Sequence, residues 1–313
     1  MIRGKVLLAA PVHAVLEDGL KEAGFELIEL PEINQAIAME HVGECVGIVT
    51  STRIQVDQKM MDAAPHLAWV ARMGSGMEVI DLDYAKSKGI VCISSPEGNA
   101  NAVAEHALGL LLNITKHISN AAEEVIHGLW LREENRGIEL EGRTIGIIGF
   151  GHTGRAFAKV LSGMDVKILA YDTHPIPPFP DKVEICDSLE RIWNEAEIVS
   201  FHVPISAETF HYFDADFLGK MKQPFILLNT SRGTVVDTHI LLGALESGKV
   251  LGLGLDVWEE EPLSKMSPEI HGLLKKIAGN PGVIITPHIA GYTFEALYKM
   301  SKVLLMKVLR ETI

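Results

Sequence analysis

Short runs of apolar residues alternate along the chain with longer stretches in which apolar residues recur at helical spacing. Each run is rich in Val, Ile and Ala and is closed by Pro, Gly or Ser. The alternation of buried strands with amphipathic helices is typical of a parallel sheet covered by helices on both faces. In the first third of the chain, the runs are 6–10, 47–50, 68–71 and 90–94, and the helical stretches include 12–23 and 56–63.

A second and stronger alternation begins near residue 144. Between the two blocks, the spacing of apolar residues predicts one long helix over 101–127, followed by a glycine-rich, charged stretch at 128–142. A final helix is predicted at 293–309, and we expect it to pack back on the N-terminal half. The second block has predicted strands at 145–150, 167–171, 197–203, 225–229, 252–257 and 283–286, predicted helices at 152–164, 189–196 and 239–247, and a proline-rich loop at 175–180.

The composition is that of a soluble globular protein. With 28 Lys and Arg against 41 Asp and Glu, the net charge is −13, which disfavours binding to nucleic acid. A length of 313 residues predicts about two domains. Cys45, Cys92 and Cys186 show no spacing typical of a metal site, so we expect reduced thiols and a cytoplasmic protein. The first apolar run is too short for a signal segment or a membrane span.

A glycine motif follows the predicted strand at 145–150. Gly149, Gly151 and Gly154 form the pattern G-x-G-x-x-G, which opens the next helix. The first glycine permits a tight turn, the second lets a pyrophosphate approach the backbone, and the third allows close packing of helix and strand. The N-terminus of a helix beginning near His152 supplies N–H groups and partial positive charge for the pyrophosphate. The motif alone is a weak signal, because glycine turns are common.

The residue that ends the next predicted strand strengthens the case for a dinucleotide. Asp172 lies 18 residues after Gly154, close to the spacing expected of a carboxylate that binds the ribose hydroxyls. Neither Lys nor Arg stands among Thr173, His174 and Pro175 to bind a 2′-phosphate. The sequence therefore favours NAD over NADP, and the alternative is a solvated Asp at the end of a strand.

Two further residues stand at carboxyl ends of predicted strands, where open α/β sheets bind ligands. Arg232 follows the strand at 225–229, and its planar guanidinium group is suited to hold a carboxylate through two bonds. His288 follows the strand at 283–286, and an imidazole gives and takes protons near neutral pH. The alternatives are a surface ion pair for the arginine and a structural role for the histidine.

These motifs occur together in an order that resembles the D-isomer-specific 2-hydroxyacid dehydrogenase family, over nearly the whole chain. The resemblance implies a Rossmann NAD-binding domain at 99–290, inserted into a flavodoxin-like substrate domain formed by 1–98 and 291–313, both doubly wound parallel sheets. The segments that carry it are 72–76 with 80–81, 99–106, 149–154, 229–233, 255–258 with 261–262, and 286–288.

The resemblance also implies roles for residues that the spacing alone does not assign. Arg232 would bind the substrate carboxylate, His288 would be the acid/base, and Glu261 would orient the imidazole. Adjacency to Pro262 selects Glu261 over Glu259 and Glu260, although an acidic run is usually a solvated face. Further residues would line NAD: Ser75, His152, Thr153, Val203, Pro204, Thr230, Ser231, Asp256 and Gly291.

Within the family, the segment 130–140 and the block 230–233 look most like 3-phosphoglycerate dehydrogenases. Arg53, Arg72 and Arg132 are then candidates to bind a substrate phosphate, or they are ordinary surface arginines. The resemblance implies a homodimer, and no C-terminal regulatory extension is expected here. The alternatives are a glyoxylate/hydroxypyruvate reductase, a D-lactate dehydrogenase, or an NAD-sensing protein similar to corepressors.

A glycine-containing loop follows the predicted strand at 68–71. Gly74, Ser75 and Gly76 would offer backbone N–H groups to a substrate carboxylate, because glycine allows a close approach. The alternative is a plain turn after a strand. The sequence therefore leaves the role of this loop open.

Overall fold

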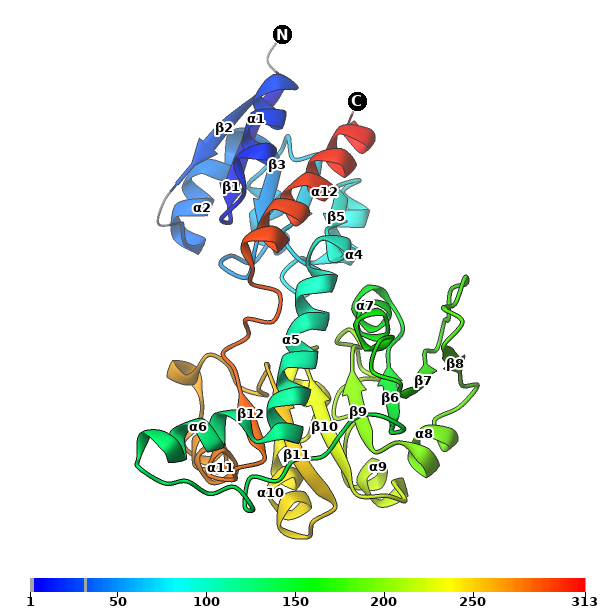
Figure 1. Ribbon diagram of the computed structural model, residues 1–313. Coiled ribbons are helices and arrows are strands. Elements are labelled where there is room, and N and C mark those ends of the chain that lie inside the picture. Colours follow the sequence, from blue (N-terminus) through cyan, green and yellow to red (C-terminus); the bar gives the residue numbers. More distant parts are fainter. Residues whose placement is uncertain (1–2, 31–32, 313) are drawn as a thin grey trace. The chain divides into compact units, whose positions relative to one another are not determined.

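The computed structural model describes residues 3–30 and 33–312. The chain divides into two compact units, each with a parallel sheet of its own (Figure 1). Unit 1 comprises residues 1–100 and 292–313, and unit 2 comprises residues 101–291. The boundaries expected from the sequence lie within two residues of these.

Unit 1 has five parallel strands in the order β2-β1-β3-β4-β5, which is the flavodoxin-like order. Apolar clusters lie on both faces of the sheet because the strand residues are buried on both sides. The strands are β1 (Gly4–Ala9), β2 (Phe25–Glu29), β3 (Cys45–Thr50), β4 (Trp69–Arg72) and β5 (Val91–Ser94), and the helices are α1 (Ala14–Glu22), α2 (Gln35–His41), α3 (Gln58–Asp62) and α4 (Leu82–Ser87), with a short 3-10 turn η1 (Val42–Glu44).

The last helix, α12 (Phe294–Thr312), belongs to unit 1 and packs on α1. The backbone of Gly19 lies so close to Leu305 that a β-carbon there would overlap its side chain. The N–H of His13 donates to Ser301 Oγ at 2.9 Å. The prediction that the terminal helix packs back on the N-terminal half is therefore confirmed.

Unit 2 has seven parallel strands in the order β12-β11-β10-β9-β6-β7-β8. The chain reverses direction across the sheet between β6 and β9, as in Rossmann folds, and apolar clusters again cover both faces. The strands are β6 (Thr144–Ile148), β7 (Lys167–Tyr171), β8 (Val183–Ile185), β9 (Ile198–Phe201), β10 (Phe225–Asn229), β11 (Val250–Leu255) and β12 (Val283–Ile285), and the helices and 3-10 turns after β6 are α7 (His152–Leu161), α8 (Glu190–Glu195), α9 (Ala215–Lys220), η2 (Gly233–Val235), α10 (Thr238–Glu246), η3 (Leu263–Lys265) and α11 (Pro268–Ala278).

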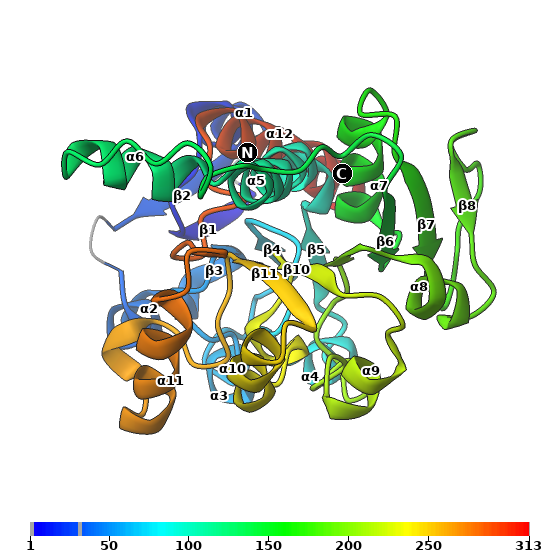
Figure 2. The ribbon, with the colours of Figure 1, turned by 60° about the horizontal axis from the view of Figure 1, so that its bottom comes forward.

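The prediction of one long helix over 101–127 is wrong. The structure has α5 (Pro96–Lys116) and α6 (Ile118–Ile126), separated at His117, whose φ of 53° is left-handed. Asn113 stabilises the break, because its side chain accepts from the N–H of Ser119 at 2.9 Å and donates to Ser119 Oγ at 2.7 Å. All nine residues of α6 are at least partly exposed, and Figure 2 shows α6 standing apart from the sheet of its own unit.

Across the described part of the chain, every helix is too short or too polar to span a bilayer.

Candidate active site

The carboxyl ends of the unit 2 strands form one edge of the sheet, because all seven strands run in the same direction. Many of the residues singled out in the sequence lie along this edge or in the helix that follows it. They are Gly149 and Gly151 after β6, His152, Thr153 and Gly154 in the first turn of α7, Asp172 after β7, Val203 and Pro204 after β9, Thr230, Ser231 and Arg232 after β10, Asp256 after β11, and His288 and Gly291 after β12.

The three glycines of the loop between β6 and α7 have the backbone features that dinucleotide binding requires. Gly149 has a φ of 90°, and a β-carbon there would overlap the backbone of His202. A β-carbon at Gly151 would meet open space, whereas one at Gly154 would overlap the carbonyl of Gly149. The loop is therefore open at its middle glycine and tightly packed at the other two.

The carboxylate of Asp172 lies at this loop. It accepts from the N–H of Phe150 at 2.6 Å and from the N–H of His174 at 2.8 Å. Gly151, the N-cap of α7, makes no side-chain capping bond, so the N–H groups of the first turn of α7 face outward at the end of the helix. An acid and a helix N-terminus therefore flank the glycine turn.

Two buried polar atoms at the same sheet edge lack a hydrogen-bond partner in the described part of the chain. His202 Nδ1 at the end of β9 and Thr230 Oγ1 at the end of β10 have no hydrogen-bond partner within residues 3–30 and 33–312. Burial lowers the pKa of His202 to about 3, so its ring is neutral at pH 7, and Nε2 hydrogen-bonds with Ser200 Oγ at 2.8 Å. Unpaired buried polar atoms are rare in proteins, and these two fit a site that a polar cofactor completes.

His288 and Glu261 form a hydrogen-bonded pair. His288 Nδ1 donates to Glu261 Oε1 at 2.5 Å, and the two side chains are 45% and 39% exposed. The hydrogen bond that His288 donates to Glu261, with the charges of Glu261 and Asp256, raises the pKa of His288 against the opposing effects of burial and Arg232. Arg232 follows β10, the strand next to β11, so it lies at the same sheet edge as the pair.

Glu261 responds in the opposite sense. Burial alone would raise the pKa of the Glu261 carboxyl, but the hydrogen bond to His288 and the charges of His288 and Arg232 lower it overall. The second oxygen of Glu261 accepts from the N–H of Trp258 at 3.3 Å. The pair therefore consists of a carboxylate and an imidazole that bonds it through Nδ1, so that Nε2 is the ring nitrogen that can exchange a proton with a substrate.

Asp256 holds the loop that presents His288. Its carboxylate is 1% exposed and accepts from the N–H groups of Ile289 and Ala290, each at 2.8 Å, and from Thr286 Oγ1 at 2.6 Å. His288 itself has a left-handed φ of 55°. The sequence predicts that Asp256 lines the cofactor; the structure places its carboxylate beneath the His288 loop.

Sequence reasoning did not single out Thr286 or His106 for the site. Thr286 Oγ1 also bonds His106 Nε2 at 2.9 Å, and His106 reaches Asp256 at 3.5 Å. Both residues stand in segments that carry the family resemblance, His106 in 99–106 and Thr286 in 286–288, and this position could have identified them. Both residues help to hold the buried carboxylate.

The three consecutive glutamates of the loop after β11 have three separate partners. Glu259 bonds His211 Nε2 at 2.6 Å, Glu260 accepts from the N–H of Ser267 at 2.6 Å, and Glu261 bonds His288. Each of the three side chains is therefore engaged in a specific contact, which argues against a merely solvated acidic face. The structure also supports Glu261 over its two neighbours as the partner of His288.

Comparison with known proteins decides the family. The model of the NAD binding domain of D-isomer specific 2-hydroxyacid dehydrogenases matches residues 108–290, which is more than half of the chain. The chain belongs to this family. NAD is the cofactor, as the glycine loop and Asp172 predict.

Individual relatives of this dehydrogenase bear different substrate names. A hydroxypyruvate reductase of Thermotoga maritima is 36% identical over 274 residues, covering 87% of each chain. A D-3-phosphoglycerate dehydrogenase of Archaeoglobus fulgidus is 34% identical over 93% of this chain, which spans 54% of that relative's length. The crystal structure of an Aquifex aeolicus D-lactate dehydrogenase with NAD and lactic acid aligns over 98% of this chain and 95% of its own, with 26% identity and a TM-score of 0.82.

In unit 1 of the dehydrogenase, the loop at residues 74–76, which was predicted to bind a substrate carboxylate, already makes one hydrogen bond within the protein. The N–H of Gly74 donates to the buried Ser95 Oγ at 3.1 Å, so the expectation that Gly74 offers this N–H to substrate is wrong. Ser75 is exposed and Gly76 half-buried, and their amides remain candidates.

The three arginines considered for a substrate phosphate lie in different environments. Arg72 is 7% exposed, and its guanidinium donates to the carbonyl of Met73, so it is no ordinary surface arginine. Arg53 in unit 1 and Arg132 in unit 2 are exposed. Only the latter two present their side chains to solvent.

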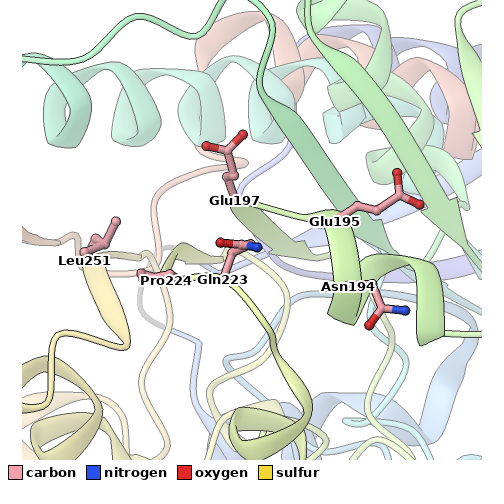
Figure 3. Close-up of a pocket in the computed structure, with 6 residues that line it drawn as sticks. All are labelled: Asn194, Glu195, Glu197, Gln223, Pro224 and Leu251. Atoms are coloured by element: carbon pink, nitrogen blue, oxygen red, sulfur yellow. The ribbon is translucent and has the colours of Figure 1, made fainter.

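A shallow hollow of about 410 Å³ opens on unit 2 of the dehydrogenase (Figure 3), at the amino ends of its strands. Glu197 precedes β9, Pro224 precedes β10, and Leu251 lies at the start of β11. Its carboxylates are already paired, Glu195 with Lys167 and Glu197 with Arg143. This hollow therefore lies at the sheet edge opposite the cofactor-binding loop.

Proposed function

We propose that this dehydrogenase transfers a hydride between NAD and C2 of a D-2-hydroxy acid, using Arg232, His288 and Glu261. The observation that carries the proposal is the His288–Glu261 pair at 2.5 Å, at the same sheet edge as Arg232, which follows the neighbouring strand β10. When bound, NAD would supply the hydride chemistry: the hydride of C2 would pass to NAD during oxidation of the hydroxy acid and return from NADH during reduction of the 2-oxo acid. The protein supplies charge, orientation and the proton.

Arg232 binds the substrate carboxylate. A guanidinium group forms two parallel bonds to a carboxylate and places the adjacent C2 oxygen in a defined position. Its charge also stabilises negative charge that develops on this oxygen during reduction. Arg232 therefore fixes the substrate and polarises its carbonyl group.

His288 exchanges a proton with the C2 oxygen. Because Nδ1 faces Glu261, Nε2 carries the exchanged proton: it protonates the oxygen during reduction and accepts the hydroxyl proton during oxidation. Glu261 fixes the ring orientation and stabilises the imidazolium form. The raised pKa of His288 extends toward higher pH the range in which the proton donor is charged.

The sheet edge of unit 2 would hold NAD. The N–H groups at the start of α7 would bind the pyrophosphate at Gly151, and Asp172 the ribose hydroxyls. His202 Nδ1 and Thr230 Oγ1 would meet polar groups of the cofactor. This arrangement uses the open middle glycine and the two unpaired buried atoms.

For the substrate, we propose 3-phosphoglycerate, oxidised to 3-phosphohydroxypyruvate in serine synthesis. The support is the likeness of segments 130–140 and 230–233 to such enzymes, and the exposed cations Arg53 and Arg132. Cations are needed because the net charge of −13 repels a phosphorylated acid. A relative named D-3-phosphoglycerate dehydrogenase adds support.

Reduction of hydroxypyruvate or glyoxylate is the second candidate. A hydroxypyruvate reductase is 36% identical to this chain, and the buried guanidinium of Arg72 bonds its own loop. These substrates have one carboxylate and no phosphate, so Arg232 alone would satisfy their charge.

Absorbance of NADH during turnover tests both proposals. The purified protein is offered 3-phosphoglycerate, glycerate and D-lactate with NAD, and their 2-oxo counterparts and glyoxylate with NADH, with NADP(H) alongside. The highest kcat/KM for 3-phosphoglycerate supports the first substrate, and the highest value for hydroxypyruvate or glyoxylate replaces it with the second. Binding of NADH without turnover of any acid would contradict the enzyme proposal and favour an NAD-sensing protein.

We further propose a homodimer located in the cytoplasm. Three free cysteines suit a reducing compartment. For the dimer, the support is an exposed apolar surface formed by α6 and the chain after it, which we call the α6 surface. Its members, all within residues 118–138, are Ile118, Val125, Ile126, Leu129, Trp130, Leu131 and Ile138. Exposed large apolar residues that gather on one part of a protein are typical of interfaces.

A further inference from the structure

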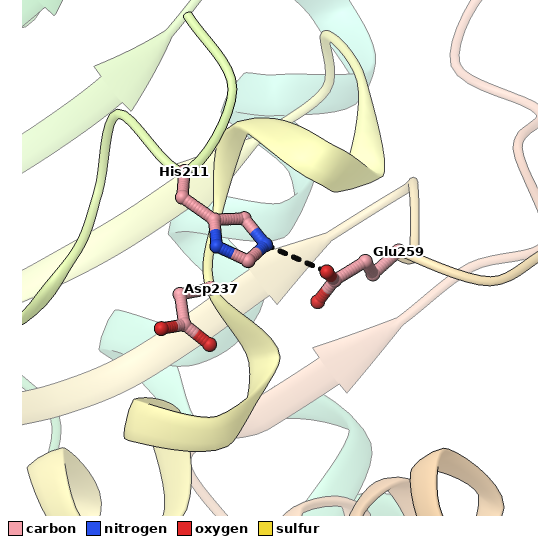
Figure 4. A group of neighbouring side chains, drawn as sticks. All are labelled: His211, Asp237 and Glu259. Atoms are coloured by element: carbon pink, nitrogen blue, oxygen red, sulfur yellow. Dashed lines mark hydrogen bonds and ion pairs between the residues drawn. The ribbon is translucent and has the colours of Figure 1, made fainter.

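Glu259 and His211 form a pair next to two of the loops that carry proposed catalytic residues, those of Glu261 and Arg232. Glu259 stands two residues before Glu261 in the loop after β11, and His211 stands in the loop between β9 and α9. One oxygen of Glu259 bonds His211 Nε2 at 2.6 Å, and the other accepts from the N–H of Thr238 at 3.1 Å. Figure 4 shows the His211 ring with Glu259 on one side and Asp237 on the other.

The segment containing His211 is fastened to the loop that follows Arg232. The N–H of His211 donates to the carbonyl of Thr234 at 2.8 Å, and that of Phe213 to the carbonyl of Val235 at 2.9 Å. The N–H of Asp237 returns a bond to the carbonyl of Phe213 at 3.0 Å. Backbone hydrogen bonds therefore join the His211 segment to the loop that begins at Arg232.

The two loops also touch directly. A β-carbon at Gly233, the residue after Arg232, would overlap the carbonyl of Trp258, the residue before Glu259. The backbone contact sets how closely the loops approach, and the bonds of Glu259 tie the loops together across it. The Glu259 side chain is only 16% exposed, so water competes little for these bonds.

We propose that the Glu259–His211 pair is a positioning element that fixes the Glu261 loop relative to the Arg232 loop. The inference rests on the proposed function of Arg232, Glu261 and His288. A carboxylate held by one imidazole and one backbone N–H resists rotation of its loop, so the Glu261 carboxylate stays where it meets His288. Neither member of the pair touches substrate in this assignment.

A divalent cation is the competing assignment for the same cluster. His211, Asp237 and Glu259 each offer one ligand atom, and these atoms lie within 4.8 Å of one another. However, Glu259 already bonds His211 and Thr238, and Asp237 accepts from the N–H of His239 at 2.9 Å. Both oxygens of Glu259 and one oxygen of Asp237 are thus already engaged in hydrogen bonds, which favours the positioning role.

The decisive variant is Glu259→Ala, and Glu260→Ala is its matched control. Misplacement of a catalytic group by about 1 Å lowers rates by on the order of 100-fold, so we expect Glu259→Ala to lower kcat/KM by about 10- to 100-fold. The apparent pKa of His288 in the pH profile should fall toward about 6.5, because its bond to Glu261 loosens. Glu260→Ala removes the same charge one residue away, with an expected change below about 3-fold.

Two more variants separate positioning from simple loss of folding. Glu259→Gln keeps an acceptor for the N–H of Thr238 and should recover much of the activity. The double variant Glu259→Ala with His211→Ala should lose no more kcat/KM than the worse of the two single variants, because the two residues act as one unit. An unchanged pH profile in Glu259→Ala, or an equal loss in Glu260→Ala, overturns the proposal.

A measurement that needs no turnover tests the positioning role separately from the proposed dehydrogenase function. The pKa of His288, followed by NMR in the intact protein, should fall in Glu259→Ala whether or not an acid is turned over. If wild-type protein oxidises no 2-hydroxy acid, the proposed function fails while this titration still decides the positioning role. Absorption bands of bound Co²⁺ that disappear in His211→Ala would instead establish a metal site and overturn it.

Discussion

At the scale of residues, the chemistry depends on neighbours that are distant in the sequence. His288 and Glu261 are 27 positions apart, and His211 and Glu259 are 48 apart. Each pair forms because parallel strands bring their following loops to one edge of a sheet. The hydrogen bonds and pKa of a single side chain in these pairs therefore depend on how two loops are placed.

The pH dependence of turnover should follow His288. Its pKa is raised, so kcat/KM for reduction should be constant at low pH and fall as pH rises through a value above about 6.5. Glu261→Gln removes the charge that causes the shift, so this fall should move to lower pH. The measurement is kcat/KM for 2-oxo acid reduction from pH 5 to 10.

The same pair links stability to pH. The raised pKa of His288 contributes stability that is fully present below the pKa of an unperturbed histidine and is lost as pH rises through the raised pKa. The lowered pKa of Glu261 contributes stability that is lost as pH falls through the lowered pKa.

The control for the pH profile of kcat/KM is Glu269→Gln, which alters an exposed glutamate 3.8 Å from His239 and should leave that profile unchanged. An unmoved profile in Glu261→Gln would contradict the assignment of the pair.

Arg232→Lys should raise KM for the 2-oxo acid and lower kcat. Lysine keeps the charge but lacks the planar fork, so it neither binds both carboxylate oxygens nor fixes the C2 oxygen. We expect a loss in kcat/KM of about 100-fold or more, in line with a bidentate ion pair of a few kcal/mol. Steady-state kinetics measure the loss, and Arg136→Lys, at an exposed ion pair with Glu133, is the control. Wild-type KM in Arg232→Lys would exclude the carboxylate role.

The sequence indicated which residue types stand at strand ends, but not what they touch. Arg232 and His288 were found from their places after strands, and Glu261 from resemblance. The engagement of Gly74 by Ser95 and of Asp256 by the His288 loop could not be predicted, because each joins segments 21 or more positions apart. Local spacing carries no information about such partners.

At the scale of elements, hydrophobic spacing predicts buried strands well and helix ends poorly. The core strands β9 and β10 fall within their predicted runs, and β6 begins one residue before its run. By contrast, β8 has three partly exposed residues at a sheet edge and no clear apolar run. The break between α5 and α6 is invisible in the spacing, since apolar residues continue past His117. It depends on one left-handed residue and on the Asn113 side chain.

Gly154→Ala should disturb the packing of α7 on β6. The added methyl group overlaps the carbonyl of Gly149, so the helix must shift away from the loop that binds the pyrophosphate. We expect a loss of stability of about 1–3 kcal/mol together with weaker binding of NADH. Thermal unfolding and calorimetric titration with NADH provide the two measurements.

Gly163 offers the matched control, because a β-carbon there meets no atom within 4 Å. Gly163→Ala should leave both the unfolding temperature and NADH affinity close to wild type. If Gly154→Ala behaved in the same way, the close contact between helix and strand would not govern the cofactor loop.

At the scale of the whole molecule, the chain has two units, each with its own sheet and its own apolar clusters on both faces. The cofactor-binding edge, the catalytic pair and Arg232 all belong to unit 2. The proposed carboxylate loop at Ser75 and Gly76 belongs to unit 1. The hydrophobic pattern predicted two alternating blocks of strands and helices, and the family resemblance predicted that the second block is inserted into the first domain.

The α6 surface should hold two copies of the chain together. Ile126 is 82% exposed, and an aspartate there would place a charge in an apolar interface. We expect Ile126→Asp to be monomeric where the wild type is dimeric, as measured by light scattering after size-exclusion chromatography. Leu263→Asp, at a residue 63% exposed outside this surface, should stay dimeric. A monomeric wild type would refute the proposed dimer.

The position of Trp69 has a practical consequence. It is the only tryptophan in the sequence of unit 1, it is 1% exposed, and it packs edge-on against Phe25 with ring centroids 6.2 Å apart. Replacing Trp130, Trp193 and Trp258 by phenylalanine would leave a single intrinsic fluorophore in unit 1. Its emission would shift to the red only when unit 1 loses its core, so the chain contains its own optical probe for whether its two halves melt together or in succession.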